Sequence, residues 1–167
     1  MLSHIDIMPI QVNLSAGGET MNKYMEVALQ EAKNGINAGH GGPFGCVVVR
    51  NGEIVGRGHN EVIKCNDPTC HGEVMAIRDA CRNLNSFDLS GCELYTTAEP
   101  CPMCFGAILW ANIRKVYYGC TIADTDKLGF RDEIFCTSSF DIKTEMDRKE
   151  CLDLFEEYKA INDRKSY

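Results

Sequence analysis

The chain has 167 residues, a length typical of one domain, and its 44% hydrophobic and 25% charged residues are normal for a globular protein. This composition excludes a disordered chain, a collagen-like repeat and a coiled coil, and the longest apolar or small run, residues 105–111, is too short for a membrane helix. The net charge of −7 disfavours a nucleic-acid partner, because an acidic surface repels phosphate backbones.

Cysteine is unusually frequent, with 10 residues in the chain. Disulfide scaffolds are usually short secreted chains, whereas this chain is long enough to bury a core without cross-links. The first twenty residues lack the basic start and the long apolar centre of a signal peptide. We therefore expect a cytoplasmic protein with mostly reduced thiols, some of them in the core and a few of them metal ligands.

Helices and strands alternate along the predicted chain. Residues 1–20 are interpreted as an N-terminal extension, either an edge strand or a loose arm, without an assigned function. In chain order, the predicted elements are a helix over 22–38, strands over 46–50 and 53–57, a helix over 69–84, a strand over 92–97, a helix over 100–112, a strand over 114–119 and a helix over 147–162. This order predicts a three-layer α/β/α domain around a mixed sheet of about five strands.

Three local signals support these boundaries. Asn51-Gly52 between β-branched runs is a strong hairpin signal. Asp67-Pro68 predicts the start of the helix over 69–84, with aspartate as the N-cap and proline in the first turn. Residues 122–140 are ambiguous, with a break at Gly129.

A metal-binding constellation is formed by His71, Cys101 and Cys104. His71 lies at one predicted helix start and the two cysteines lie at another, with His71 and Cys101 30 residues apart. One imidazole and two thiolates make a three-ligand zinc set that leaves a fourth position for water, as in catalytic zinc sites. Zinc lowers the pKa of bound water toward about 7, so that hydroxide is available at neutral pH. Glu73, two residues after the histidine, is placed to move protons between water and a leaving group.

Two simpler roles are also open to these cysteines. Cys101 and Cys104 alone would suit a thioredoxin-like redox site, but such a site does not require the histidine or the glutamate. A structural zinc site could instead recruit Cys65 or Cys70. The remaining cysteines are predicted to be core or inert surface residues. The other histidines, His4, His40 and His59, have no second metal motif around them and are predicted to lie in loops, with His59 lining the pocket.

The chain resembles the cytidine deaminase superfamily from about Asn22 to its C-terminus. The His-x-Glu and Pro-Cys-x-x-Cys pattern is the signature of zinc base deaminases. The other motifs that carry the resemblance are Gly42-Pro43-Phe44-Gly45, Asn60, Asn66-Asp67-Pro68-Thr69, Leu94-Tyr95-Thr96-Thr97 and Gly106-Ala107-Ile108.

The resemblance implies a cytidine-deaminase-like fold over residues 21–167 as one domain. It also implies a homodimer or larger assembly, one zinc ion per subunit bound by His71, Cys101 and Cys104, and hydrolytic release of ammonia from a nucleobase. In that chemistry, zinc-bound hydroxide is the nucleophile and Glu73 is the catalytic proton shuttle.

The C-terminal part resembles the bacterial guanine deaminases, which have a Gly-Phe-x-Asp segment, here residues 129–132, and a terminal tyrosine, here Tyr167. In that family the C-terminal segment crosses to the partner subunit and covers its active site. The likeness implies that Asp132 accepts hydrogen bonds from purine N–H groups, that Asn60 holds the polar edge of the ring and that Phe44 lies against its face. Guanine is therefore the expected substrate, with xanthine and ammonia as products.

Some observations leave alternatives open. Gly72 stands where bacterial guanine deaminases usually have alanine, and His-Gly-Glu also occurs in small zinc cytosine deaminases, which lack the match at residues 129–132. Relatives that deaminate guanosine or cytidine share much of the pattern. A tRNA adenosine deaminase is the main alternative with a nucleic-acid partner, but the basic residues at 148–165 are interleaved with acidic ones. A binding module without activity would contain no zinc.

Overall fold

A mixed sheet forms the centre of the fold. The computed structural model describes residues 11–12 and 21–137. The sheet has the strand order β1-β5-β4-β2-β3. The pairs β1–β5 and β5–β4 are parallel, and the pairs β4–β2 and β2–β3 are antiparallel. Its strands are β1 (Gln11–Val12), β2 (Gly45–Arg50), β3 (Glu53–His59), β4 (Cys92–Ala98) and β5 (Lys115–Cys120). Within the predicted extension 1–20, residues 11–12 thus form an edge strand.

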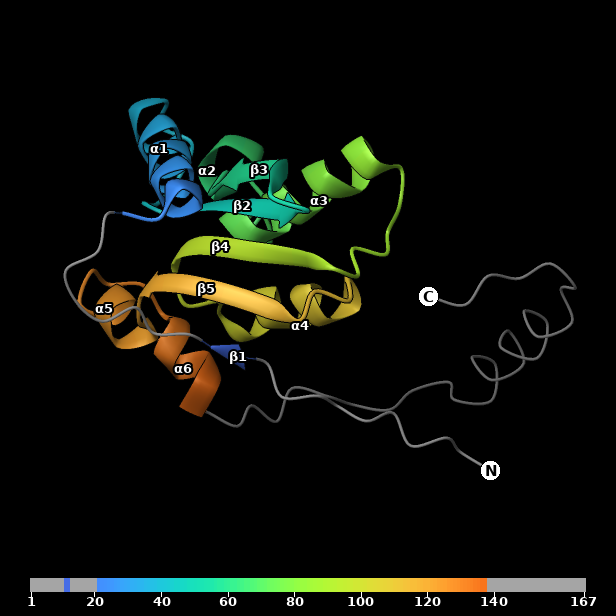
Figure 1. The fold of residues 1–167 in the computed structure, drawn as a ribbon. Helices are drawn as coiled ribbons and strands as arrows, with labels where there is room; N and C mark the ends of the chain where they lie inside the picture. The colour runs from blue at the N-terminus through green and yellow to red at the C-terminus, as the bar shows by residue number, and fades with distance from the viewer. Residues whose placement is uncertain (1–10, 13–20, 138–167) are drawn as a thin grey trace, which may run out of the picture. The chain divides into compact units, whose positions relative to one another are not determined.

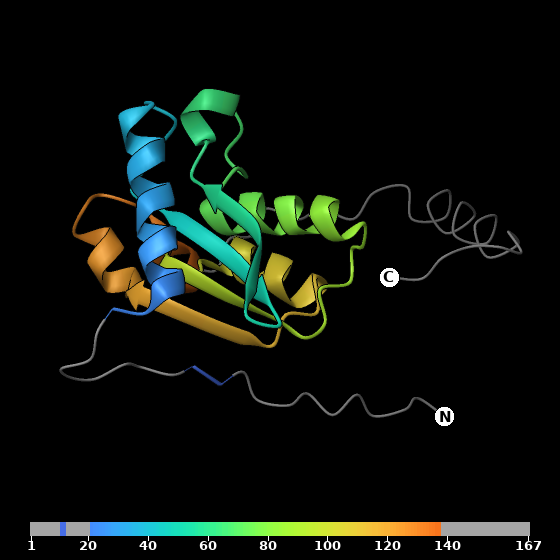
Figure 2. The same cartoon turned by 45° about the horizontal axis from the view of Figure 1, so that its top comes forward.

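Helices lie on both faces of this sheet (Figures 1 and 2), which confirms the three-layer α/β/α prediction. The helices are α1 (Lys23–Asn37), α2 (Val62–Cys65), α3 (Gly72–Leu84), α4 (Pro102–Trp110), α5 (Ile122–Asp126) and α6 (Asp132–Thr137). The predicted helix over 147–162 lies outside the described residues. Within residues 21–137, no helix combines the length and the apolar character that crossing a bilayer requires.

Alternation along β2 divides the core into two parts. Val47 and Val49 face α1 and pack with Ala28 and Tyr95. Cys46 and Val48 point to the opposite face, where α3, α4 and the β4 residue Leu94 complete the larger core cluster. Successive side chains of a strand point to opposite sides, so a strand between two helical layers is apolar on both. The continuous apolar run of β2 follows from this position.

The first helix and the hairpin form where the sequence pattern predicted them. The side chain of Asn22 caps α1 by accepting hydrogen bonds from the amides of Tyr24 and Met25. At the tip of the β2–β3 hairpin, Asn51 and Gly52 both have positive φ, at 51° and 82°. Positive φ at both central residues is typical of the tight hairpin turn that Asn-Gly favours.

The predicted start of the helix over 69–84 is wrong. The Asp67 carboxylate accepts hydrogen bonds from the amide and hydroxyl of Thr69, at 2.8 and 2.7 Å, and so closes a local turn instead of capping a helix. The helix α3 begins at Gly72, with His71 as its N-cap residue. Aspartate before proline favours both a turn and a helix start, and here the turn forms.

Two glycines of β3 bring α3 directly onto the strand. A Cβ atom at Gly58 would lie 2.6 Å from the carbonyl oxygen of Gly72 and 2.8 Å from the carbonyl carbon of Met75, and it would also contact the amide of Ala76. At Gly56 it would meet the backbone of the next turn of α3. Because neither position has a side chain, α3 packs directly against β3, and this close packing sets the distance of the N-terminal part of α3 from the sheet.

Candidate active site

Three potential metal ligands meet at the starts of two helices. His71 is the N-cap residue of α3, Cys101 is the N-cap residue of α4, and Cys104 lies in the first turn of α4. The His71 Nδ1 atom lies 3.7 Å from the sulfur of Cys101 and 3.5 Å from the sulfur of Cys104. Tetrahedral zinc with Zn–S bonds of about 2.3 Å and Zn–N bonds of about 2.05 Å places nitrogen and sulfur ligands about 3.6 Å apart. The donor set and its spacing therefore fit zinc.

The electrostatics of this cluster favour a thiolate. The hydrogen bond from Cys104, together with the one from His71, lowers the pKa of the Cys101 thiol to about 4. The same bond to Cys101, followed by burial, raises the pKa of Cys104 well above its usual range. The hydrogen bond to Cys101 also raises the pKa of His71. A cluster that concentrates negative charge on sulfur suits a soft, thiophilic cation.

Glu73 lies in the first turn of α3 and is 5% exposed. Burial, together with the negative charge of Cys101, raises the pKa of its carboxyl group to about 7. A group with a pKa near neutral pH is well placed both to accept and to release a proton. The structure thus places a candidate general acid and base beside the metal-binding cluster.

The cluster opens into a cavity of about 710 Å³, within the range of small-molecule sites. The loop at 41–44, the segment 60–69 and residues 130–135 form its walls, and His71, Glu73 and Cys101 line its floor. Phe44 and Phe130 meet edge to face in the wall, with ring centroids 4.8 Å apart. An apolar wall of this kind can hold the face of an aromatic base.

Asn60 contributes a polar group to the wall. Its Oδ1 atom accepts hydrogen bonds from the amides of Gly42 and Val62, both at 3.3 Å. With the oxygen engaged in this way, the Nδ2 amide group is the part of the side chain that can donate to a ligand. Asn60 is only 5% exposed, so its orientation is fixed by the surrounding backbone.

Asp132, the first residue of α6, lines the same cavity. The hydroxyl of Thr125 lies 2.7 Å from the carbonyl oxygen of Ile122 and 3.3 Å from Oδ2 of Asp132. Because the hydroxyl has one proton and the carbonyl is nearer, the carboxylate keeps most of its accepting capacity. Burial, then the charge of Cys101, raises the pKa of Asp132. This side chain can therefore accept hydrogen bonds from a ligand with N–H groups.

The structure brings together seven of the eight predicted site residues, and the eighth, Tyr167, lies outside the described residues. The seven are Phe44, Asn60, His71, Glu73, Cys101, Cys104 and Asp132. Phe130 was not among the predicted site residues, although its position in the Gly-Phe-x-Asp segment was a usable signal. Among the described residues, Cys65 and Cys70 are not part of this metal-binding cluster.

The prediction for His59 is wrong. It ends β3 instead of lying in a loop, and it does not belong to the residues that line the cavity. Its ring contacts that of His40 outside the cavity. The register of β3 and the loop after α1 bring the two rings together, which no short motif indicates.

Comparison with known proteins indicates the same kind of site as the geometry does. The sequence profile of the cytidine and deoxycytidylate deaminase zinc-binding region matches residues 19–120. The chain belongs to this deaminase family. As a zinc-binding deaminase, the protein is an aminohydrolase. The matched region includes the three candidate zinc ligands and Glu73, whereas Asp132 lies beyond it.

Individual relatives have different substrates in their names. Guanine deaminase of Bacillus subtilis strain 168 is 49% identical over 109 residues, which are 65% of this chain and 70% of that protein. A tRNA-specific adenosine deaminase of Aquifex aeolicus is 46% identical over 95 residues, which are 57% of this chain and 62% of that protein. The X-ray structure of guanine deaminase from Bacillus subtilis superposes with a TM-score of 0.80 and 39% identity, covering 88% of this chain and 99% of that one.

Proposed function

We propose that this deaminase converts guanine and water to xanthine and ammonia, with one zinc ion per subunit bound by His71, Cys101 and Cys104. The observation that supports guanine as the substrate is the position of the Asp132 carboxylate. It lines the same cavity as the proposed zinc ligands His71 and Cys101. Guanine has N–H donors at N1, N2 and N9, and a carboxylate is a pure acceptor. The similarity to guanine deaminase of Bacillus subtilis supports the same substrate.

The chemistry divides between the ion and the protein. Zinc held by these ligands would supply a water molecule activated for attack on C2 of the base. Glu73 would transfer both protons of that water in turn: the first goes to the ring nitrogen N3, and the second, taken from the hydroxyl group that forms at C2, goes to the departing amine, which leaves as ammonia. Its pKa of about 7 supports both transfers at neutral pH.

Recognition of the base would come from the cavity walls. Asp132 would accept from ring N–H groups, Asn60 would donate from Nδ2, and Phe44 would pack against the ring face. A site built around buried hydrogen-bonding groups rejects analogues that leave those groups unpaired. This arrangement would favour guanine over bases without its row of donors.

We also propose that residues 21–167 form one cytoplasmic catalytic domain that works as a homodimer. The nine cysteines among the described residues are free thiols, as expected in a reducing compartment. Three apolar side chains of α4, Met103, Phe105 and Leu109, are 37–40% exposed and offer an apolar surface to a second copy. The expected exchange of the C-terminal segment and the closure of the partner's site by Tyr167 remain predictions, because both lie outside the described residues.

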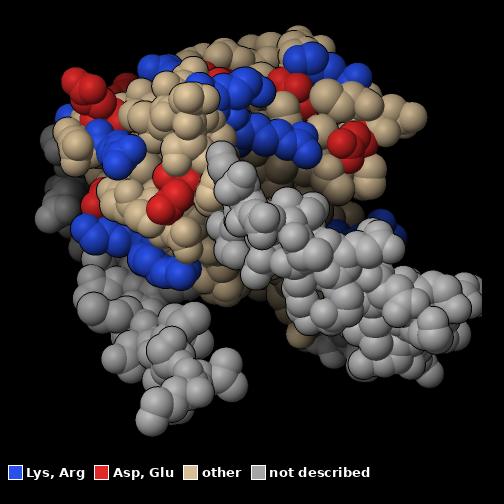
Figure 3. Space-filling view, turned by 90° about the vertical axis from the view of Figure 1, so that its right-hand side faces the viewer, with Lys and Arg blue, Asp and Glu red and all other residues tan. Residues whose placement is uncertain are grey.

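A second candidate is tRNA adenosine deaminase activity, which the similarity to the Aquifex aeolicus enzyme favours. RNA binding relies on neutralising phosphates with lysine and arginine. The chain has a net charge of −7, and on the described part of the face shown in Figure 3 basic side chains are interspersed with acidic and uncharged ones. The charge distribution therefore supports a small base over an RNA stem.

The test is ammonia release by the zinc-loaded protein from guanine, guanosine, cytosine, adenine and a tRNA anticodon stem-loop. We expect turnover of guanine and its loss in Glu73→Gln, with zinc content unchanged. Glu53→Gln, the same change at an exposed position at the far end of β3, is the matched control and should behave as the wild type. Turnover of cytosine or of the stem-loop with guanine inert would refute the proposed substrate, and full activity of Glu73→Gln would refute the proton shuttle.

A further inference from the structure

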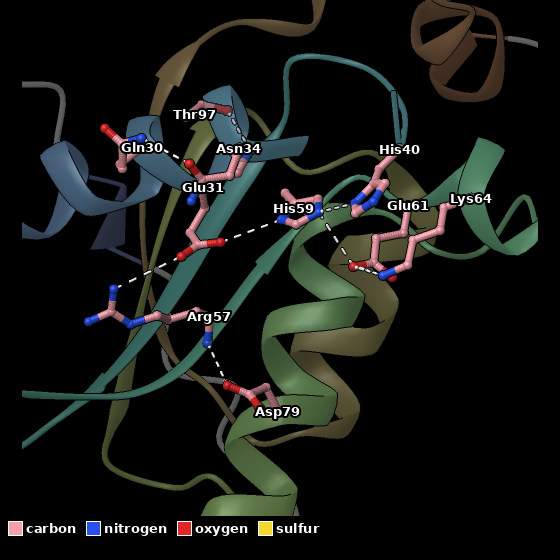
Figure 4. Close-up of polar contacts among 11 residues, drawn as sticks. Gln30, Glu31, Asn34, His40, Arg57, His59, Glu61, Lys64, Asp79 and Thr97 are labelled. Carbon is pink, nitrogen blue, oxygen red and sulfur yellow. Dashed lines mark hydrogen bonds and ion pairs between the residues drawn. The ribbon is translucent and has the colours of Figure 1, made fainter. Parts of the chain in front are cut away.

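A second group of side chains that could hold a metal ion lies at the end of β3, apart from the zinc ligands. His40, His59 and Glu61 each point a donor atom into one small region, within 4.8 Å of one another. The Nδ1 atom of His40 lies 2.8 Å from Nε2 of His59, and the same Nε2 atom lies 3.4 Å from Oε1 of Glu61. Figure 4 shows the His59 ring between these residues and Glu31.

The hydrogen bonds around His59 leave its Nε2 lone pair facing this region. Its Nδ1 atom lies 3.4 Å from Oε2 of Glu31, so the proton of the neutral ring belongs on Nδ1. The Nε2 lone pair then points toward a region that it shares with the carboxylate of Glu61. The Nδ1–H group of His40 and the ammonium group of Lys64 now satisfy these two acceptors, and a metal ion could replace both partners.

We propose that His40, His59 and Glu61 bind a divalent transition-metal ion such as Zn²⁺. Imidazole nitrogen and carboxylate oxygen are suitable ligands for zinc, nickel and copper. Ligands held at about 2.05 Å in tetrahedral geometry are about 3.3 Å apart. The distance of 3.4 Å between His59 and Glu61 already matches this value. The 2.8 Å between the two imidazole nitrogens has to widen by about 0.5 Å when the ion replaces the proton that they share.

Two further features suit a metal site. A histidine ligand almost always donates its other ring N–H to a carboxylate or a carbonyl group, which fixes the ring and raises its basicity. Glu31 occupies this position for His59. The side chains of His59, Glu61 and Glu31 are only 14–16% exposed, so their orientations are constrained by packing, and the absence of a side chain at Gly35 leaves room for the His59 ring.

Lys64 is the cation that now neutralises Glu61, with Nζ 3.0 Å from Oε1. Its side chain is 46% exposed, so it can turn into solvent when an ion arrives, at little cost. Lys64 is therefore a competitor of the metal for one carboxylate oxygen. Removing its charge should strengthen metal binding, and a purely structural ion pair would not give that result.

The proposed site is linked to the wall of the cavity through the backbone. The carbonyl oxygen of His40 accepts hydrogen bonds from the amides of Ile63 and Lys64, at 3.0 and 3.1 Å. Asn60 stands between His59 and Glu61 in the chain, and its side chain lines the cavity. An ion at this site would thus connect the two segments that hold Asn60.

The test is a titration with Co²⁺ of protein that contains one equivalent of zinc per chain, enough to fill only the cysteine-containing site. We expect visible d–d absorption that saturates at one equivalent per chain, without a near-ultraviolet thiolate-to-cobalt charge-transfer band, because the three ligands include no sulfur. The absence of that band distinguishes this site from the cysteine-containing one, and the absorption measurement does not depend on enzyme activity.

The variants make the assignment specific. His40→Phe keeps a ring against His59 but removes the nitrogen, and it should abolish the absorption, as should Glu61→Gln. Glu31→Gln should weaken cobalt binding by about 10–100-fold, and Lys64→Gln should tighten it. Asp79→Asn, a nearby carboxylate outside the cluster (Figure 4), is the control and should leave binding unchanged. The proposal is overturned if no d–d absorption appears in excess cobalt, or if it persists unchanged in both His40→Phe and Glu61→Gln.

Discussion

The contact between Gly58 and α3 gives a sharp prediction about how the fold positions the active site. An added methyl group in Gly58→Ala would lie 2.6 Å from the carbonyl oxygen of Gly72 and closer still to the amide of Ala76, whereas ordinary contact begins at 3.4 Å, so the strand and the helix have to separate by at least about 0.8 Å. The obstructing atoms belong to the backbone and cannot rotate away. Overpacking of this kind typically costs about 1–3 kcal/mol, and we expect the upper end of that range.

The displaced turn of α3 contains His71 and Glu73, and metal–ligand bond lengths in well-formed sites stay within about 0.2 Å of their usual values. We therefore expect Gly58→Ala to unfold about 10 °C lower than the wild type and to bind zinc more weakly. Circular dichroism melting and the zinc content after dialysis measure the two effects. The control is Arg57→Ala, which removes an exposed side chain 4.0 Å from Glu31. A Gly58→Ala protein that melts within about 2 °C of the wild type with full zinc content would refute the reasoning.

Three further predictions concern recognition, assembly and pH. Asp132→Asn should lower kcat/KM for guanine by about 10–100-fold with zinc retained, because a charge-assisted hydrogen bond is lost, and unchanged steady-state kinetics would remove Asp132 from recognition. Phe105→Glu should convert the dimer to a monomer in sedimentation experiments, since it places a charge on the exposed face of α4, and a persistent dimer would mean that the interface lies elsewhere. The hydrogen bond from Lys115 lowers the pKa of Glu93 below its ordinary value of about 4.5. The ion pair therefore contributes fully to the free energy of unfolding above that pH, and this contribution disappears as the pH falls through the lowered pKa. Glu93→Gln should therefore cost less than about 1 kcal/mol in urea unfolding at neutral pH and nothing at strongly acidic pH, and an equal cost at both would contradict this assignment.

Much of the fold could be predicted from local signals. The Asn22 cap and the Asn51-Gly52 turn act through neighbouring backbone groups, so the sequence contains the whole cause. The start of α3 could not be predicted in this way, because the Asp67 side chain can stabilise a turn or a helix start equally well. The helix also packs its first turns against Gly58 of the sheet, a tertiary contact that the residues around Asp67 do not encode.

The candidate site was predictable where its chemistry is encoded in short spacings. His71 and Glu73 are two residues apart, and Cys101 and Cys104 lie three apart, so that one helix start presents each pair. The contacts of His59 were not predictable, because its partner His40 is 19 residues away and the two meet only through the loop after α1.

The floor and the walls of the cavity come from different parts of the chain. The reactive side chains lie at the starts of α3 and α4, fixed by the sheet and by close helix packing, whereas Phe130 and Asp132 belong to a short segment after β5. Because that segment contributes to the cavity wall and holds none of the candidate zinc ligands, we expect changes within it to alter the choice of base more than the hydrolytic chemistry. For protein engineering, the consequence is that residues 128–137 are the natural unit to graft between relatives when a new substrate is wanted.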